Sequence, residues 1–157
     1  MAIRNILNEK EPILHKMCRP VTEFNEHLWQ LLDDMAETLH QADGVGLAAP
    51  QVGVLRRMFV MDVGDGVVDV INPQYLVKKG KQENVEGCLS LPGIYGITRR
   101  PAYVKIKAYD RYGKEFTIEG EDLLARCICH ESDHLDGVIF TKHVIRMLEP
   151  ENKDKEK

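Results

Sequence analysis

The chain has 157 residues, of which 43% are hydrophobic, so it is long enough to form one domain with a sizeable core. Its 21 basic and 25 acidic residues give a net charge of −4, which argues against general binding to nucleic acid or to a membrane surface. The first residues contain no apolar run typical of a signal peptide, and no stretch is long enough to span a bilayer. We therefore expect a cytoplasmic protein whose four cysteines are free thiols.

The N-terminal part of the chain predicts turns followed by one long helix. Residues 1–24 hold short apolar pieces around two prolines and predict turns with one short helical turn. Asn25 is a suitable N-cap, and leucine and methionine side chains then recur at helical spacing, which predicts an amphipathic helix over residues 26–41. This apolar stripe indicates core packing rather than a cofactor site, and Trp29 should cover its edge.

The next segment, residues 43–51, reads Asp-Gly-Val-Gly-Leu-Ala-Ala-Pro-Gln. Its small side chains allow a ligand or another strand to approach the backbone closely, although a tight turn would also explain the two glycines. The glycine spacing differs from that of a phosphate-binding loop, and no lysine follows. Gln51 is a polar residue in apolar company, which indicates a hydrogen-bonding role.

The middle of the chain is dominated by strand patterns. We predict strands at residues 57–63, 67–72, 74–79, 85–91, 103–109 and 115–118, with Pro73 separating the second from the third. The strand at 85–91 carries Cys88. Residues 140–148 should close a single domain over 1–149, and the charged residues 150–157 should form a solvated, mobile tail.

Residues 127–137 read Cys-Ile-Cys-His-Glu-Ser-Asp-His-Leu-Asp-Gly and contain the pattern His-Glu-x-x-His. The apolar periodicity here predicts a helix that ends near Gly137. Residues four apart lie on one face of a helix, so His130 and His134 can bind one divalent metal ion. Glu131 lies beside that face, where it can take a proton from the attacking water. Two histidines at this spacing can also be ordinary core or surface residues.

A metal site of this kind needs a third protein ligand. A metzincin would continue the pattern to a third histidine, but that position is Phe140. A protease of the thermolysin kind would use a later glutamate, and Glu149 and Glu151 lie in a short charged segment with no helix to hold them. Cys88 is the third candidate, because a thiolate is a strong ligand for iron(II) or zinc.

Three stretches now stand in order: Gly44–Gln51, Glu86–Ser90 and His130–His134. Their order and spacing resemble those of the peptide deformylase family, and the resemblance covers nearly the whole chain. It implies an α+β fold in one domain, with antiparallel β-sheets surrounding a central metal-binding α-helix. It also implies a metal-dependent hydrolase that removes the N-formyl group from the N-terminal formyl-methionine of nascent polypeptides and releases formate.

The resemblance further implies the roles of individual residues. Cys88, His130 and His134 would hold one metal ion, which is iron(II) in the family, with zinc, nickel or cobalt as possible substitutes. Glu131 would act as general acid and base, while Gln51 and the backbone N–H of Leu89 would face the formyl oxygen. The residues that contact the peptide and its methionine side chain would be Val45, Gly46, Glu86, Gly87, Leu123, Arg126 and Cys127.

The chain departs from the family pattern at two positions. Cys129 stands where glutamine is common, and it should point about 100° away from His130 around the helix, so we do not expect it to be a ligand. Tyr95 stands where some members have arginine, which affects the outer contacts to the peptide. The resemblance implies a monomer that meets nascent formyl-methionyl peptides at the ribosome, without direct binding to nucleic acid or membrane.

Two other functions are compatible with the same histidine pair. One is a small zinc endopeptidase, which shares the His-Glu-x-x-His core. The other is a closed structural zinc site in which Cys127 or Cys129 supplies a fourth ligand. Glu131 and Gln51 argue against the structural site, because a closed site would give neither side chain a purpose.

Overall fold

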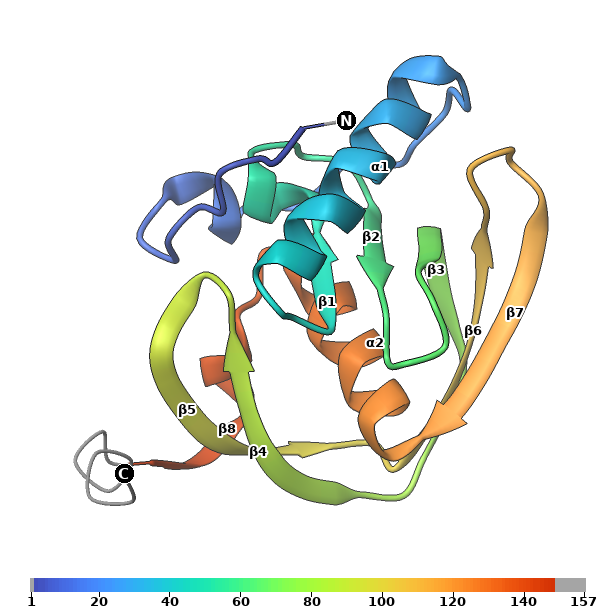
Figure 1. Cartoon of the computed structure of the whole chain (residues 1–157). Coiled ribbons are helices and arrows are strands. Elements are labelled where there is room, and N and C mark those ends of the chain that lie inside the picture. Colours follow the sequence, from blue (N-terminus) through green and yellow to red (C-terminus); the bar gives the residue numbers. More distant parts are fainter. Residues whose placement is uncertain (1, 149–157) are drawn as a thin grey trace.

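The structure, a computed structural model, describes residues 2–148. The helices are α1 (Glu26–Gln41) and α2 (Asp122–Leu135), and three short 3-10 helices are η1 (Pro12–His15), η2 (Ala49–Val52) and η3 (Phe140–His143). The strands are β1 (Gly46–Ala48), β2 (Met58–Met61), β3 (Val68–Lys79), β4 (Gln82–Cys88), β5 (Leu91–Arg100), β6 (Tyr103–Tyr109), β7 (Glu115–Glu121) and β8 (Val144–Met147). Figure 1 shows α2 at the centre of the molecule and α1 on its outside.

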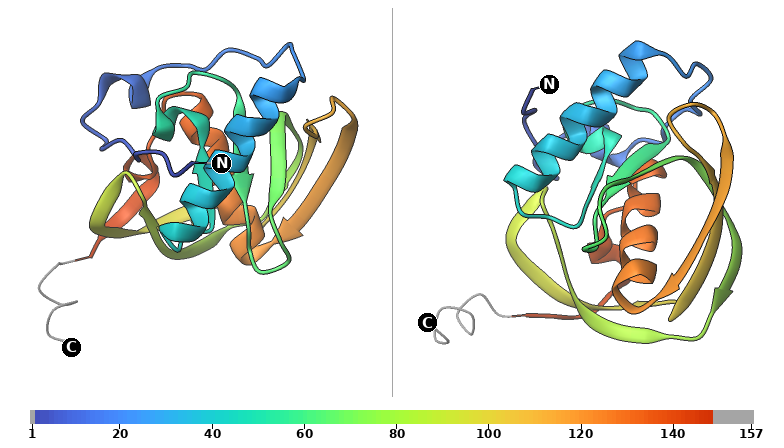
Figure 2. Two further views of the ribbon diagram at one scale, coloured as in Figure 1. Left: turned by 45° about the horizontal axis from the view of Figure 1, so that its top comes forward. Right: turned by 45° about the vertical axis from the view of Figure 1, so that its right-hand side comes forward.

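The strands form two sheets whose neighbouring strands are all antiparallel. Five strands pair in the order β1-β2-β3-β6-β7, and the other three pair in the order β4-β5-β8. The two sheets enclose α2, as the right-hand view of Figure 2 shows. The expected α+β fold, with antiparallel sheets around a central helix in one domain, is confirmed.

The strand β2 is buried on both faces because a helix covers each side of the sheet at this point. Met58 and Val60 belong to the core cluster that contains the apolar stripe of α1. Phe59 and Met61 alternate with them and belong to the cluster that contains the inner residues of α2. Side chains in a strand alternate between faces, so this continuous apolar run joins the two helices through one layer of sheet.

The helix α1 forms as its sequence predicts. The side chain of Asn25 accepts a hydrogen bond from the backbone N–H of Leu28, which caps the first turn. The leucine and methionine stripe is buried, and Trp29 lies at its edge, where its indole N–H donates to the carbonyl of Arg111 over 2.6 Å. That bond ties the turn between β6 and β7 to α1.

Pro73 does not divide two strands as expected, because β3 runs without a break from Val68 to Lys79. Its pairing with β6 shifts register between Ile71 and Gln74, so the proline lies in a bulge and needs no ladder hydrogen bond there. Asn72 supports the bulge in a left-handed conformation with φ of 51°, and its side chain bonds both backbone groups of Val21.

The expected close approach of another strand to residues 43–51 is confirmed, because β1 pairs with β2. Two further expectations about strands are corrected. The chain turns after Cys88, so the strand expected at 85–91 ends there, and Leu91 begins β5, a ten-residue strand that was not predicted from the sequence. The strand β7 extends to Glu121 rather than ending at Ile118.

The first and last residues of the expected domain (1 and 149) and the expected tail (150–157) lie outside the described residues. No helix within residues 2–148 is long and apolar enough to cross a membrane. All four cysteines are free thiols, as expected.

Candidate metal centre

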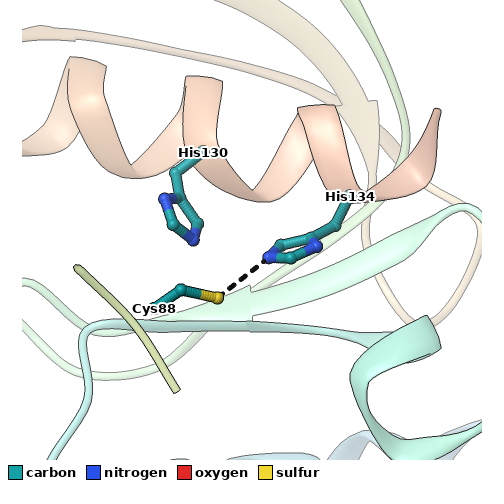
Figure 3. Close-up of side chains that lie close together, drawn as sticks. All are labelled: Cys88, His130 and His134. Atoms are coloured by element: carbon teal, nitrogen blue, oxygen red, sulfur yellow. Dashed lines mark hydrogen bonds between the residues drawn. The ribbon is translucent and has the colours of Figure 1, made fainter. Parts of the chain in front are cut away.

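The donor atoms of Cys88, His130 and His134 lie within 4.8 Å of one another. The helix α2 presents the two imidazoles one turn apart, and the end of β4 brings the thiol beneath them (Figure 3). Cys88 Sγ lies 3.4 Å from His134 Nε2. Two ligands of a tetrahedral zinc ion, at metal distances of about 2.3 Å for sulfur and 2.0 to 2.1 Å for nitrogen, would be separated by about 3.5 Å. Cys88 and His134 therefore have the spacing of two ligands of one divalent ion, and the donor of His130 lies within 4.8 Å of both.

Glu86 determines which ring nitrogen of His130 faces the metal site. His130 Nδ1 lies 2.5 Å from Glu86 Oε2, which leaves Nε2 to face the site. Arg100 donates to both carboxylate oxygens of Glu86 over 2.7 and 3.2 Å, and the hydroxyl of Thr98 donates over 2.9 Å. Burial alone would raise the pKa of Glu86, but these bonds from His130 and Arg100 outweigh it and lower the pKa to about 2. Glu86 is thus a carboxylate at neutral pH.

His134 is buried and neutral. Burial, followed by the nearby His130, lowers the pKa of His134 well below its ordinary value, and a neutral imidazole is the form that binds metals. Its Nδ1 is buried and has no hydrogen-bond partner among residues 2–148. The buried ring of Phe140, which does not line the cavity, stacks on His130 with centroids 5.9 Å apart.

Glu131 is held in a dry position beside the histidines. Its side chain is buried, and Oε1 has no hydrogen-bond partner in the described part of the chain. Burial raises the pKa of Glu131 to about 7, against the opposing effect of His130. A side chain at position 46 would not fit, because a Cβ on Gly46 would lie 2.7 Å from Glu131 Oε2. The glycine therefore lets β1 pass directly against the carboxyl group.

Gln51 has an amide orientation fixed by the backbone. Its Oε1 accepts a hydrogen bond from the N–H of Ala48 over 2.9 Å, so its NH₂ group must face the other way. That group lies 3.1 Å from the hydroxyl of Ser90 and 3.6 Å from Cys88 Sγ. The η2 turn thus directs a hydrogen-bond donor at Cys88, one of the three metal-ligand candidates.

A cavity of about 410 Å³ opens over these groups. Every site residue expected from the sequence lines this cavity except His134, which lies behind it. The expected residues along its wall are Val45, Gly46, Gln51, Glu86, Gly87, Cys88, Leu89, Leu123, Arg126, Cys127, His130 and Glu131.

The two cysteines of α2, Cys127 and Cys129, do not belong to the donor group. Cys127 Sγ lines the cavity and lies 3.6 Å from the carbonyl oxygen of Val45. Cys129 is 4% exposed and packs in the core cluster between α2 and the five-stranded sheet. Its place on that face agrees with the angle around the helix predicted from the sequence.

The sequence reasoning missed the residues that support the site. These are Ser90, Thr98, Arg100, Asp133 and Phe140. Glu86 was expected to line the pocket, which it does, but its contact with His130 was not foreseen. No local pattern points to Arg100, because its burial against the carboxylate of Glu86 arises only where β4 and β5 pair.

Residues 3–149 match the sequence model of the polypeptide deformylase family. A peptide deformylase of Thermoanaerobacter pseudethanolicus is 52% identical over 157 residues, which span 100% of this chain and 99% of the relative. The crystal structure of peptide deformylase from Thermotoga maritima has a TM-score of 0.90 at 41% identity, over 92% of this chain and 99% of that one. That of the Legionella pneumophila enzyme has a TM-score of 0.88 at 42% identity, over 98% and 90%. The chain belongs to the polypeptide deformylase family and is a metal-dependent hydrolase that removes the N-formyl group from nascent polypeptides.

Proposed function

We propose that Cys88, His130 and His134 hold one metal ion, and that Glu131, Gln51 and the backbone N–H of Leu89 carry out the deformylation. The observation that carries this proposal is the buried Glu131, whose pKa is raised to about 7, placed next to His130 and beside a compact set of three metal donors. A general base works best when its pKa lies near the operating pH.

The reaction breaks the amide bond between the formyl carbon and the peptide nitrogen. A divalent cation on these donors would polarise the formyl carbonyl and make a water molecule more acidic. Glu131 takes the proton of the attacking water and then gives it to the leaving nitrogen, so that the amine departs neutral. Its carboxyl group has no competing hydrogen-bond partner on Oε1 within residues 2–148, which leaves it free for both transfers.

Two donors stabilise the negative charge that develops on the formyl oxygen. The NH₂ group of Gln51 is directed at the site by Ala48, and the backbone of Leu89 follows Cys88 at the turn out of β4. A preorganised donor of this kind is worth roughly 10²–10³ in rate. The cavity walls near Gly44 and Gly46 are tight, so a hydrogen on the acyl carbon should fit better than a methyl group.

The edge strand β1 provides the binding surface for the peptide. It ends the five-stranded sheet, so an extended peptide can pair with its backbone at Gly46. The methionine side chain would enter the cavity between Val45, Leu123 and Cys127, where two exposed apolar side chains form the rim. We assign Glu86, Gly87 and Arg126 to the same wall.

The metal is proposed to be iron(II), because a thiolate and two imidazoles suit it, with zinc, nickel or cobalt as substitutes. We further propose that the protein works as a monomer in the cytoplasm, and that it meets its formyl-methionyl substrates as they emerge from the ribosome. We propose one catalytic domain over residues 1–149.

The decisive experiment replaces Glu131 by glutamine, which preserves shape and removes proton transfer. Anaerobically purified protein should keep stoichiometric metal while formate release from a formyl-methionyl peptide falls by ~10²–10⁴ or more. Parallel assays with the acetyl analogue and with casein test the substrate class, and both should give little cleavage. A variant with full metal and near-normal formate release would refute the role of Glu131, while casein cleavage would favour an endopeptidase.

A further inference from the structure

A chain of polar contacts leads from the metal centre to the protein surface, where it ends at His143. Glu86, which contacts His130, receives two hydrogen bonds from Arg100, as described above. The Nη1 atom of Arg100 also donates to Asp133 Oδ2 over 2.6 Å. His143 Nε2 lies 3.2 Å from that same oxygen of Asp133. Each consecutive pair is therefore within direct contact distance.

The residues of this chain of contacts lie in four separate elements, one of which is the metal-binding helix α2. Glu86 lies in β4, Arg100 in β5, Asp133 in α2 and His143 in η3. The side chain of Arg100 is 3% exposed, whereas that of His143 is 38% exposed. The inner contacts are consequently dry and strong, while the outermost one can be altered from the surface without opening the core.

Arg100 is the point at which the outer contact can influence the inner one. Its single guanidinium serves two carboxylates, and Asp133 divides one oxygen between Arg100 and His143. Without His143, the partly exposed Asp133 can turn toward water, and Nη1 of Arg100 then loses its fixed partner. The guanidinium group of Arg100 can then move more freely relative to the carboxylate of Glu86. The acceptor on the far nitrogen of a metal-binding histidine sets the direction of its ring, so a shift of Glu86 would be felt at His130.

We infer that His143 is a positioning residue for the metal centre. Through Asp133, Arg100 and Glu86 it holds the imidazole of His130 in the orientation in which Nε2 faces the ion. This inference rests on the proposed role of His130 as a metal ligand, and it goes beyond that role by assigning a surface residue to the stability of the site.

The first test compares three variants of the full-length protein loaded with cobalt(II). His143→Leu removes the ring nitrogen that contacts Asp133, His143→Gln replaces it with an amide that offers an N–H, and His40→Leu is a matched control. His40 makes a similar contact, 2.9 Å to Asp62, but on α1, and neither residue lines the cavity. The readouts are the cobalt absorption spectrum and the loss of metal to a competing chelator.

His143→Leu should weaken cobalt binding by about 3- to 10-fold, below the upper range for partners that contact a ligand directly, and should shift the absorption bands. His143→Gln should restore both quantities to within about twofold, and His40→Leu should change neither. In the iron enzyme His143→Leu should lower kcat with little change in KM, because the peptide-binding wall is untouched.

The second test asks whether His143 acts through Asp133. Asp133→Ala should weaken cobalt binding by about 10-fold, and adding His143→Leu to it should cause no further loss, since the path is already broken. The inference would be overturned if the losses of cobalt affinity in the two single variants multiplied fully in the double variant. It would also be overturned if His143→Leu kept wild-type metal binding and a wild-type spectrum. Failure of the underlying ligand assignment looks different, because His130→Ala would then keep the wild-type cobalt spectrum. Should His143→Leu not fold, His143→Ala takes its place with the same readouts: weakened cobalt binding with a shifted spectrum supports the path, and wild-type values refute it.

Discussion

The two helices both bury one face, but they bury different kinds of side chain. The buried face of α1 is mainly leucine and methionine, and it packs on β1 and β2. The buried face of α2 includes His130, Glu131, Ser132 and His134. Apolar burial is non-directional, so α1 needs only a flat apolar neighbour. Buried polar groups need specific partners, and His130 and His134 find theirs in Glu86 and Cys88 of β4.

This difference separates stability from activity within one small domain. Changes on α1 should alter the free energy of unfolding and leave the chemistry intact, whereas changes around α2 should abolish chemistry at modest cost in stability. The predictions below test that separation, beginning with the largest expected effect.

Replacing Cys88 by alanine should remove the metal and all measurable formate release. The thiol is one of three donors within 4.8 Å, and two histidines alone leave the ion weakly held. Metal analysis of the purified variant gives the result. Cys129→Ala is the matched control, because that thiol packs in the core between α2 and the five-stranded sheet, and this variant should keep full metal. A metal-replete Cys88→Ala protein would show that the third ligand lies elsewhere.

Gln51→Leu should lower turnover by roughly 10²–10³ while the metal stays bound, since one donor to the developing oxyanion is lost. Steady-state formate release with metal analysis checks this. Ser90→Ala is a useful control, because it removes a partner of the Gln51 amide but leaves the amide itself held by Ala48. The loss of turnover in Ser90→Ala should be much smaller than that in Gln51→Leu. Equal losses in the two variants would mean that Gln51 serves only to pack the loop.

Leu32→Ala on α1 should lower the free energy of unfolding by about 3 kcal/mol, because this side chain is fully buried and leaves a cavity. The kcat of the folded fraction should be unchanged. Urea unfolding and formate release on the same sample give both quantities. His27→Ala, at an exposed position of α1, should shift stability by less than about 0.5 kcal/mol. A large fall in kcat for Leu32→Ala would break the proposed separation of the two helices.

The same contrast explains what could be predicted from the sequence. The helix α1 follows from its cap and its periodicity, and both are local properties. The histidine pair of α2 is also local, and Cys88 could be named because its chemistry suits a metal. Arg100, Asp133 and Phe140 could not be named, because their roles depend on contacts between elements that are far apart in the chain. Likewise the bulge at Pro73 depends on register with β6, which no local pattern contains.

The smallest expected effect concerns Cys18, which links the N-terminal segment to the end of α2. Its backbone N–H donates to the carbonyl of Leu135 over 2.8 Å, and its side chain is 4% exposed. Arg57 bonds the same carbonyl and the carboxylate of Asp136. Burial raises the pKa of the Cys18 thiol from 9.0 to about 11, although the charge of Arg57 opposes the shift.

The sign of the resulting pH dependence follows from that raised pKa. The unfolded chain loses the thiol proton near pH 9.0, whereas the folded protein keeps it until about pH 11. The stability that Cys18 contributes is therefore complete below pH 9 and is lost as the pH rises toward 11. The contribution of Cys18 should be about 1 kcal/mol, since a pKa shift of one unit corresponds to about 1.4 kcal/mol and Arg57 and solvent screen part of the effect.

Urea unfolding of the wild type and Cys18→Ala from pH 8 to 11 isolates this contribution, because every other titrating group is common to both. The two stability curves should converge by about 1 kcal/mol over that interval. Parallel curves would show that the C-terminal end of α2 holds the thiol in a wetter setting than its burial indicates, and that the polar surroundings of α2 reach this far along the helix.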